Sequence, residues 1–179
     1  VSFAFATFMK TVMEEAELSD IDFSQATLGS SSFKNAKIKK VNFSSANLEG
    51  VTFEEATLMG CNFKNANLTN CDFSQAKLSD CDFQGTNLDH SSFYSTTIDN
   101  CNFSFSRMLY AFLKQVIISK SRFGGTNARG SDLSFSKMTE VDMKGAILKY
   151  ADLNSCTLTD VNMTNSNLIG ADLKDAQCA

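Results

Sequence analysis

The chain has 179 residues, with 16 lysines and arginines against 20 aspartates and glutamates, which gives a formal net charge of −4. This length fits one domain. A surface that follows nucleic-acid phosphates should be markedly basic, so the charge argues against a nucleic-acid partner. No apolar run approaches the roughly 18 residues of a transmembrane helix, so we expect no membrane span.

The N-terminal segment, residues 1–13, already carries the pattern that governs the chain. Large apolar residues fall at Phe3, Phe8 and Met13, a step of five residues. This step fits neither the period of a helix nor that of a strand. The segment lacks the basic start of a signal peptide and stays in register. We therefore interpret it as part of a repeat.

The register continues to Cys178 without an insertion and gives 36 central positions, of which only Ala128 and Cys178 are not large and apolar. The residue two places before each centre is mostly small, and the residue between them is often Asn or Asp. A short strand points the centre and the small residue to one face. Two polar residues then let the chain turn a corner. The sequence predicts a coil whose sides each point one large and one small residue inward.

From Phe23 to Phe103, phenylalanine alternates with leucine or isoleucine at the centres, which indicates an even number of sides. The segments "CDFSQ", "ANLTN", "ADLNS" and "ADLKD" resemble the tandem motif of pentapeptide-repeat proteins, and the resemblance covers essentially the whole chain. It implies an all-β fold, a right-handed quadrilateral parallel β-helix of about nine coils with about 20 residues each. At a strand spacing of ~4.8 Å the solenoid would be roughly 43 Å long.

The six cysteines follow the same register. Five occupy small inward positions, and Cys178 occupies a centre; the five are Cys61, Cys71, Cys81, Cys101 and Cys156. Residues 20 apart should stack with parallel side chains, a poor geometry for disulfides. We expect buried free thiols, no zinc site because no histidine joins them, and a reducing compartment. That compartment is the cytoplasm or, for a secreted protein, a host-cell cytosol.

Both ends of the chain fall within the register and show no capping element. An uncapped solenoid exposes a sheet edge and an apolar cross-section. We therefore expect residues 1–179 to form a single repeat domain excerpted from a longer protein, or to associate end to end with another copy.

Candidate chemistry is sparse. His90 lies between Asp89 and Ser91 at a corner, where neighbouring residues cannot form a nucleophile, base and orienting group, so we interpret it as an exposed turn residue. The glycine-rich stretch 123–130 precedes no helix that could receive a phosphate. Beside these glycines, Ala128 should make a weak point in the core. We expect no enzyme, cofactor or metal in this segment, and a catalytic domain fused elsewhere stays open.

Three functions remain open. The first is a non-enzymatic scaffold for protein–protein interaction, including the β-helix domain of a secreted bacterial effector, which the family resemblance implies. The second, also implied by the resemblance, is a DNA mimic that binds DNA gyrase and gives quinolone resistance. Mimicry needs a dense acidic stripe, whereas lysines interrupt most sides. The third is a structural spacer.

Outward positions are polar almost everywhere, so outward apolar residues mark a candidate partner-binding surface. The apolar members are Tyr94, Leu109, Tyr110, Phe112 and Tyr150. Below Phe112, each step of 20 residues reaches a carboxylate: Asp132, Asp152 and Asp172. This combination predicts a protein partner with an aliphatic anchor and lysines or arginines. Alternatively, the aromatics cover a local distortion or a segment outside this stretch.

Overall fold

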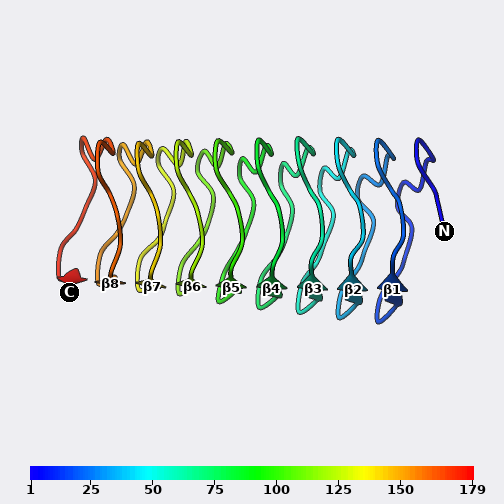
Figure 1. The fold of residues 1–179 in the computed structure, drawn as a ribbon, viewed down its shortest axis with the longest axis horizontal. Helices are drawn as coiled ribbons and strands as arrows, with labels where there is room; N and C mark the ends of the chain where they lie inside the picture. The colour runs from blue at the N-terminus through cyan, green and yellow to red at the C-terminus, as the bar shows by residue number, and fades with distance from the viewer.

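The computed structural model describes residues 1–179, which wind into one continuous solenoid from the N-terminus to the C-terminus (Figure 1). One side of the solenoid is a parallel sheet of nine strands in sequential order. The strands recur every 20 residues: β1 (Glu17–Ser19), β2 (Lys37–Lys39), β3 (Thr57–Met59), β4 (Lys77–Ser79), β5 (Thr97–Asp99), β6 (Ile117–Ser119), β7 (Lys137–Thr139), β8 (Thr157–Thr159) and β9 (Gln177–Cys178).

The other three sides are built from single parallel bridges with the same 20-residue step, beginning with Ser2 to Asp22, Thr7 to Thr27 and Val12 to Ser32. We name the four sides by the first residue at each centre: first side (Phe3), second side (Phe8), third side (Met13) and fourth side (Leu18). Each name includes every residue 20, 40 or more positions on. The predicted four-sided parallel coil is confirmed. No helix long and apolar enough to cross a bilayer is present.

The corners require a left-handed backbone conformation at every fifth residue. Every fifth residue from Phe5 to Asp175 has a φ between +49° and +70°, although most of these residues are not glycine. A left-handed conformation costs a non-glycine residue about 1–2 kcal/mol. Coil-to-coil hydrogen bonds hold the corners in place; the Tyr110 N–H, for example, donates to the Arg129 carbonyl at 3.0 Å. Repetition of these bonds along the whole solenoid offsets the strain.

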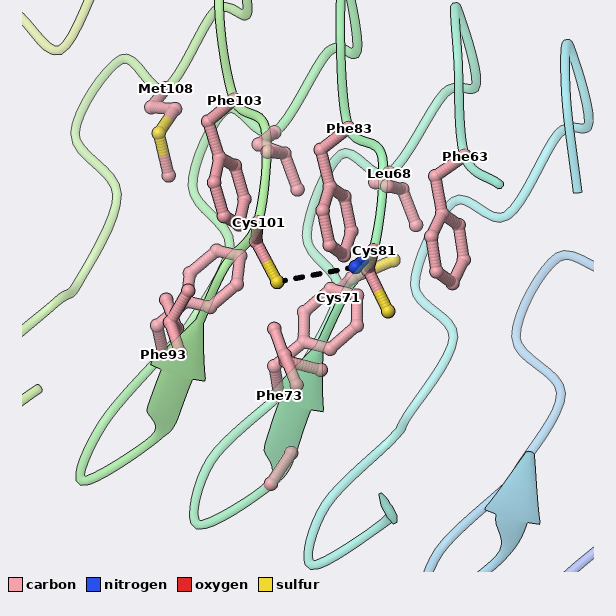
Figure 2. Packing of buried hydrophobic residues seen from close by; sticks show 14 of the residues in the cluster. Phe63, Leu68, Cys71, Phe73, Cys81, Phe83, Phe93, Cys101, Phe103 and Met108 are labelled. Atoms are coloured by element: carbon pink, nitrogen blue, oxygen red, sulfur yellow. Dashed lines mark hydrogen bonds between the residues drawn. The ribbon is translucent and has the colours of Figure 1, made fainter. Parts of the chain in front are cut away.

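The interior is a single apolar cluster dominated by two columns of phenylalanine rings (Figure 2). On the first side, the Phe83 and Phe103 rings stack with centroids 4.5 Å apart and planes 4° apart. On the third side, Phe73 and Phe93 stack at 4.9 Å. The two columns meet edge to face across the interior, as between Phe73 and Phe83 at 5.9 Å and 83°. The alternation of phenylalanine from Phe23 to Phe103 therefore corresponds to two stacked columns on opposite sides.

Cysteines stacked 20 residues apart lie at the corner after the fourth side, the one corner where the backbone makes no turn hydrogen bond of its own. After the first three sides, an N–H bonds back three residues, as from Ala26 to the Phe23 carbonyl; after the fourth side this bond is missing. There, the Cys81 N–H donates to Cys101 Sγ at 3.4 Å (Figure 2), and the Cys101 N–H donates to Ser121 Oγ at 3.0 Å. Side-chain acceptors therefore satisfy amides that would otherwise be buried unpaired.

All six cysteines are free and five are buried, as predicted. The buried thiols are not simply small apolar groups, because they also donate to carbonyls, as Cys101 does to Asp99 at 3.2 Å. A hydrogen bond with Cys101, followed by burial, raises the pKa of the Cys81 thiol to about 12. Burial raises the pKa of Cys71 as well. These thiols therefore stay protonated at neutral pH.

The glycine-rich stretch 123–130 leaves the coil register unchanged. Ala128 is buried in the core cluster, and its N–H keeps its bond to the Ile147 carbonyl of the next coil at 2.8 Å. A weak point at Ala128 stays a prediction, because the short side chain changes packing rather than backbone pairing.

Candidate partner-binding surface

Exposed aromatic side chains gather on the third side, which we take from corner to corner as residues 10–15 and their equivalents in each later coil. Beyond the first coil, six aromatic residues are exposed, and Phe105 alone of these lies off the third side. The other five are Tyr94, Tyr110, Phe112, Phe135 and Tyr150. The structure therefore brings together all four predicted aromatic residues, and it adds Phe135, which is 52% exposed.

Tyr94 and Phe112 form a flat apolar patch on neighbouring coils. Their ring centroids lie 6.1 Å apart with planes 25° apart, and both side chains remain about 40% exposed. The ammonium group of Lys114, on the coil of Phe112, lies 5.2 Å from the centroid of the Phe135 ring on the next coil. The patch is therefore accessible and is flanked by a cation–π pair.

At the corner of the third side, tyrosine rings cover glycines of the following coil. A Cβ atom built on Gly130 would lie 2.6 Å from the Tyr110 ring, and one on Gly170 would lie 2.5 Å from the Tyr150 ring. Phe105 covers Gly125 in the same way at a different corner. The rings therefore fill the space that the glycines leave, while the coil-to-coil hydrogen bonds stay regular. Yet Tyr110 and Tyr150 are still 56% and 59% exposed, so most of each side chain is free to bind.

The predicted carboxylate column is present beside these tyrosines. Parallel bridges join Phe112 to Asp132, Asp132 to Asp152 and Asp152 to Asp172, so the carboxylates repeat at about 4.8 Å. One oxygen of each accepts the N–H two residues on, at 2.9 Å in all three turns. The second oxygen has no protein donor in any of the three. The column therefore supports the turns and still offers one free acceptor per coil.

The third side also carries the charge imbalance of the whole chain. It holds nine of the 20 carboxylates and four of the 16 basic side chains, a surplus of five negative charges against a total net charge of −4. The carboxylates are Glu14, Glu15, Glu54, Glu55, Asp72, Asp132, Asp152, Asp172 and Asp175, and the basic residues are Lys10, Lys34, Lys114 and Lys174. The other three sides together are close to neutral, so the net negative charge of the chain is concentrated on the third side.

Leu109 is the one predicted residue that lies off this surface. It sits on the second side, partly buried, and its N–H donates to Asp89 Oδ1 at 3.0 Å. Arg107 binds the other oxygen of Asp89, through Nε at 2.7 Å. Burial opposes ionisation of Asp89, but the hydrogen bonds from Arg107 and Leu109 outweigh it, and the pKa of Asp89 is lowered. This pair anchors the corner next to His90.

Three further neighbours were not assigned to this surface from the sequence. The His90 ring stacks on Tyr110 with centroids 5.6 Å apart, and the Arg129 guanidinium lies 5.6 Å from the Tyr150 ring centroid. Ser134 lies between the carboxylate column and Phe135, and its buried hydroxyl has no hydrogen-bond partner. These residues lie beside the aromatics because successive coils stack on one another, so only the 20-residue spacing of the coils could have indicated them.

No group of three or more His, Cys, Asp or Glu side chains is arranged to hold a metal ion. The hollows of the surface also lie away from the aromatics of the third side. One is on the fourth side around Lys37 and Met59, a second around Lys64 and Phe105, and a third near Met9. Around these aromatics the third side is therefore a flat or ridged surface, whereas the hollow near Met9 reaches the corner of this side at Ser30, Gly50 and Asn70.

Comparisons with known proteins agree with this architecture. The family profile described as "Pentapeptide repeat region" matches residues 56–133, and the profile "Pentapeptide repeats (8 copies)" matches residues 16–54 and 136–175. Among curated proteins, none matches the chain.

Solved structures show the same fold. A trypsin-treated variant of QnrB1, a plasmid-mediated fluoroquinolone resistance protein, is 20% identical with a TM-score of 0.64, and the match covers 99% of this chain and 87% of that one. HetL, involved in heterocyst differentiation regulation in the cyanobacterium Nostoc sp. strain PCC 7120, is 21% identical with a TM-score of 0.49, covering 99% and 86%. The two family profiles together cover most of residues 16–175, so the chain belongs to the pentapeptide-repeat family.

Proposed function

We propose that this protein is a non-enzymatic scaffold whose third side binds a protein partner. The proposal rests on one observation: two features that favour binding occur together on the same one of the four sides. Five of the six exposed aromatics beyond the first coil and the whole negative surplus of the chain lie there. Exposed aromatics are typical anchors of protein interfaces, and a one-signed surface steers an oppositely charged partner.

The solenoid suits this role because it presents the surface without reorganisation. Each coil is bonded to the next on all four sides, and the ring columns fill the interior. A preformed surface avoids much of the entropy cost of ordering on binding. The free buried thiols favour a reducing compartment, so we propose the cytoplasm or the cytosol of a host cell as the place of action.

The experiment is affinity capture with four variants of the surface, each checked for folding by circular dichroism. Tyr110→Ala and Phe112→Ser remove aromatic anchors, and Asp132→Asn and Asp152→Asn remove charge while retaining an acceptor for the turn. We expect all four to weaken capture of the same partner. If all four stay folded and retain every partner of the unaltered protein, the third side is not the binding surface.

A second candidate function is protection of DNA gyrase by mimicry of DNA. The segregation of carboxylates to one side favours it, as does the fold shared with a fluoroquinolone resistance protein. Against it, Lys34, Lys114 and Lys174 share one column of that side and break its negative potential. A gyrase supercoiling assay decides between the two: protection from a quinolone, or inhibition by micromolar protein, would support mimicry over the scaffold.

A further inference from the structure

We propose that the third side recognises a basic, proline-rich peptide in the polyproline II conformation, lying along the solenoid axis across coils six to nine. This proposal rests on the proposed function and names the chemistry of the partner. The contacts would be made by Tyr110 and Tyr150 on one line and by Phe112, Asp132, Asp152 and Asp172 on the next.

The first support is the spacing of the tyrosines. Tyr110 and Tyr150 occupy the same corner two coils apart, with Gly130 between them. Two coils span about 9.6 Å. One turn of a polyproline II helix takes three residues and spans about 9.3 Å. Residues three apart in such a peptide therefore meet one tyrosine each.

The second support is the chemistry of the two exposed tyrosines. Each ring packs one region against a glycine and leaves more than half of the side chain exposed. Proline-rich segments dock on aromatic surfaces of this kind. Their backbone carbonyls lack internal hydrogen bonds, so they can accept from the tyrosine hydroxyls.

The third support is charge. The free carboxylate oxygens beside the tyrosines repeat once per coil, so Asp132 and Asp172 are also two coils apart, about 9.6 Å. The same three-residue step that brings prolines to the tyrosines brings arginines or lysines to the carboxylates. A ligand with basic residues would also relieve the mutual repulsion of stacked carboxylates.

Other peptide conformations fit less well. An extended strand repeats its side chains every two residues, about 6.6–6.8 Å, which is not a multiple of the coil spacing. An α-helix is about 10–12 Å wide with its side chains and rises about 5.4 Å per turn, which does not match the two-coil spacing of about 9.6 Å. The hollows of this molecule lie elsewhere, around Lys37, Lys64 and Met9. A slim peptide on a ridged surface matches the third side best.

The probe is a fluorescent 12-residue peptide of four arginine-proline-leucine triplets, measured by fluorescence anisotropy. Its control has the same composition in an order without a three-residue period. We expect saturable binding of the periodic peptide and at least tenfold weaker binding of the control. We expect Tyr110→Leu and Tyr150→Leu each to weaken binding at least fivefold.

Two matched variants separate recognition from folding. Phe105→Leu removes the same ring-on-glycine contact at another corner, and Asp142→Asn alters the same kind of turn on the first side, where Asp142 accepts the Lys144 N–H at 3.1 Å. Both should bind like the unaltered protein, whereas Asp152→Asn should bind more weakly.

Equal binding of the two peptides, or equal losses from Tyr150→Leu and Phe105→Leu, overturns the proposal. If the captured protein partner still depends on the third side, the proposed function stands and only the peptide chemistry is wrong. Binding of a soluble cellulose derivative that depends on the tyrosines, with no binding of the peptide, would identify a carbohydrate platform instead and would also overturn it.

Discussion

Phe73 lies at the centre of the ring columns, so its removal tests what holds the solenoid together. It is fully buried and stacks between Phe53 and Phe93 with centroids 4.9 Å apart on both sides. It also meets Phe63 and Phe83 edge to face at 6.4 Å and 5.9 Å. Truncation of a buried phenylalanine to alanine costs about 3–5 kcal/mol. The loss of four ring pairs, each worth about 0.5–1.5 kcal/mol and not additive, places Phe73→Ala near the upper end.

Leu113→Ala is the comparison, because Leu113 occupies the same column two coils on and is also buried, 1% exposed. It has no ring to stack, so we expect a loss near the lower end of the about 2–5 kcal/mol range for leucine. The assay is equilibrium unfolding in guanidinium chloride followed by circular dichroism. Equal losses for the two variants would refute the idea that stacked rings add to the stability that burial provides.

Three further predictions concern the corners and the thiols. Gly130→Ala should destabilise the protein more than Gly145→Ala in the same unfolding assay. Both residues have positive φ, which costs alanine about 1–2 kcal/mol, but only at Gly130 would the new Cβ meet an aromatic ring. Similar losses of stability for the two variants would mean that the ring moves away freely. Asp89→Ala should lower the free energy of unfolding by about 1–3 kcal/mol at pH 7. Folding lowers the pKa of Asp89 from 3.8, so the stability that its carboxylate contributes is complete above that value and is lost as the pH falls through the lower folded value. The difference in stability between the variant and the unaltered protein should therefore disappear only in acid. Native alkylation at pH 8 should label Cys178 alone, because the other five thiols are buried and burial limits access of the reagent. For Cys81, a pKa raised to about 12 adds to this protection. Mass spectrometry showing fast labelling of a buried thiol would contradict this.

The fold could be predicted from the sequence because one register governs every coil. A step of five residues fixes which side chains point inward, and the alternation of phenylalanine from Phe23 to Phe103 fixes opposite sides. What the sequence could not show is the left-handed backbone at every fifth residue. Residues as different as Lys120 and Phe135 occupy those positions, since coil-to-coil hydrogen bonds rather than residue type hold them there.

The candidate surface was predicted in part for the same reason. Tyr94, Phe112 and the carboxylate column follow directly from positions 20 residues apart, and the structure places them side by side. Leu109 and Tyr110 form the two-residue turn that ends the second side, so Leu109 lies farther from Phe112 than the sequence spacing suggested, and its part in a binding surface stays a prediction. The packing of Tyr110 on Gly130 depends on side-chain direction, which no spacing in the sequence specifies.

Site-specific photocrosslinking tests the central claim, that the third side is the binding surface. A photoreactive benzoyl-phenylalanine would replace Phe112 in one protein and Phe105 in another; both residues are exposed aromatics, and they lie at different places around the coil. The account predicts a crosslinked partner from position 112 and none from position 105. Crosslinking of the same partner from position 105 alone, or equally from both positions, would contradict it.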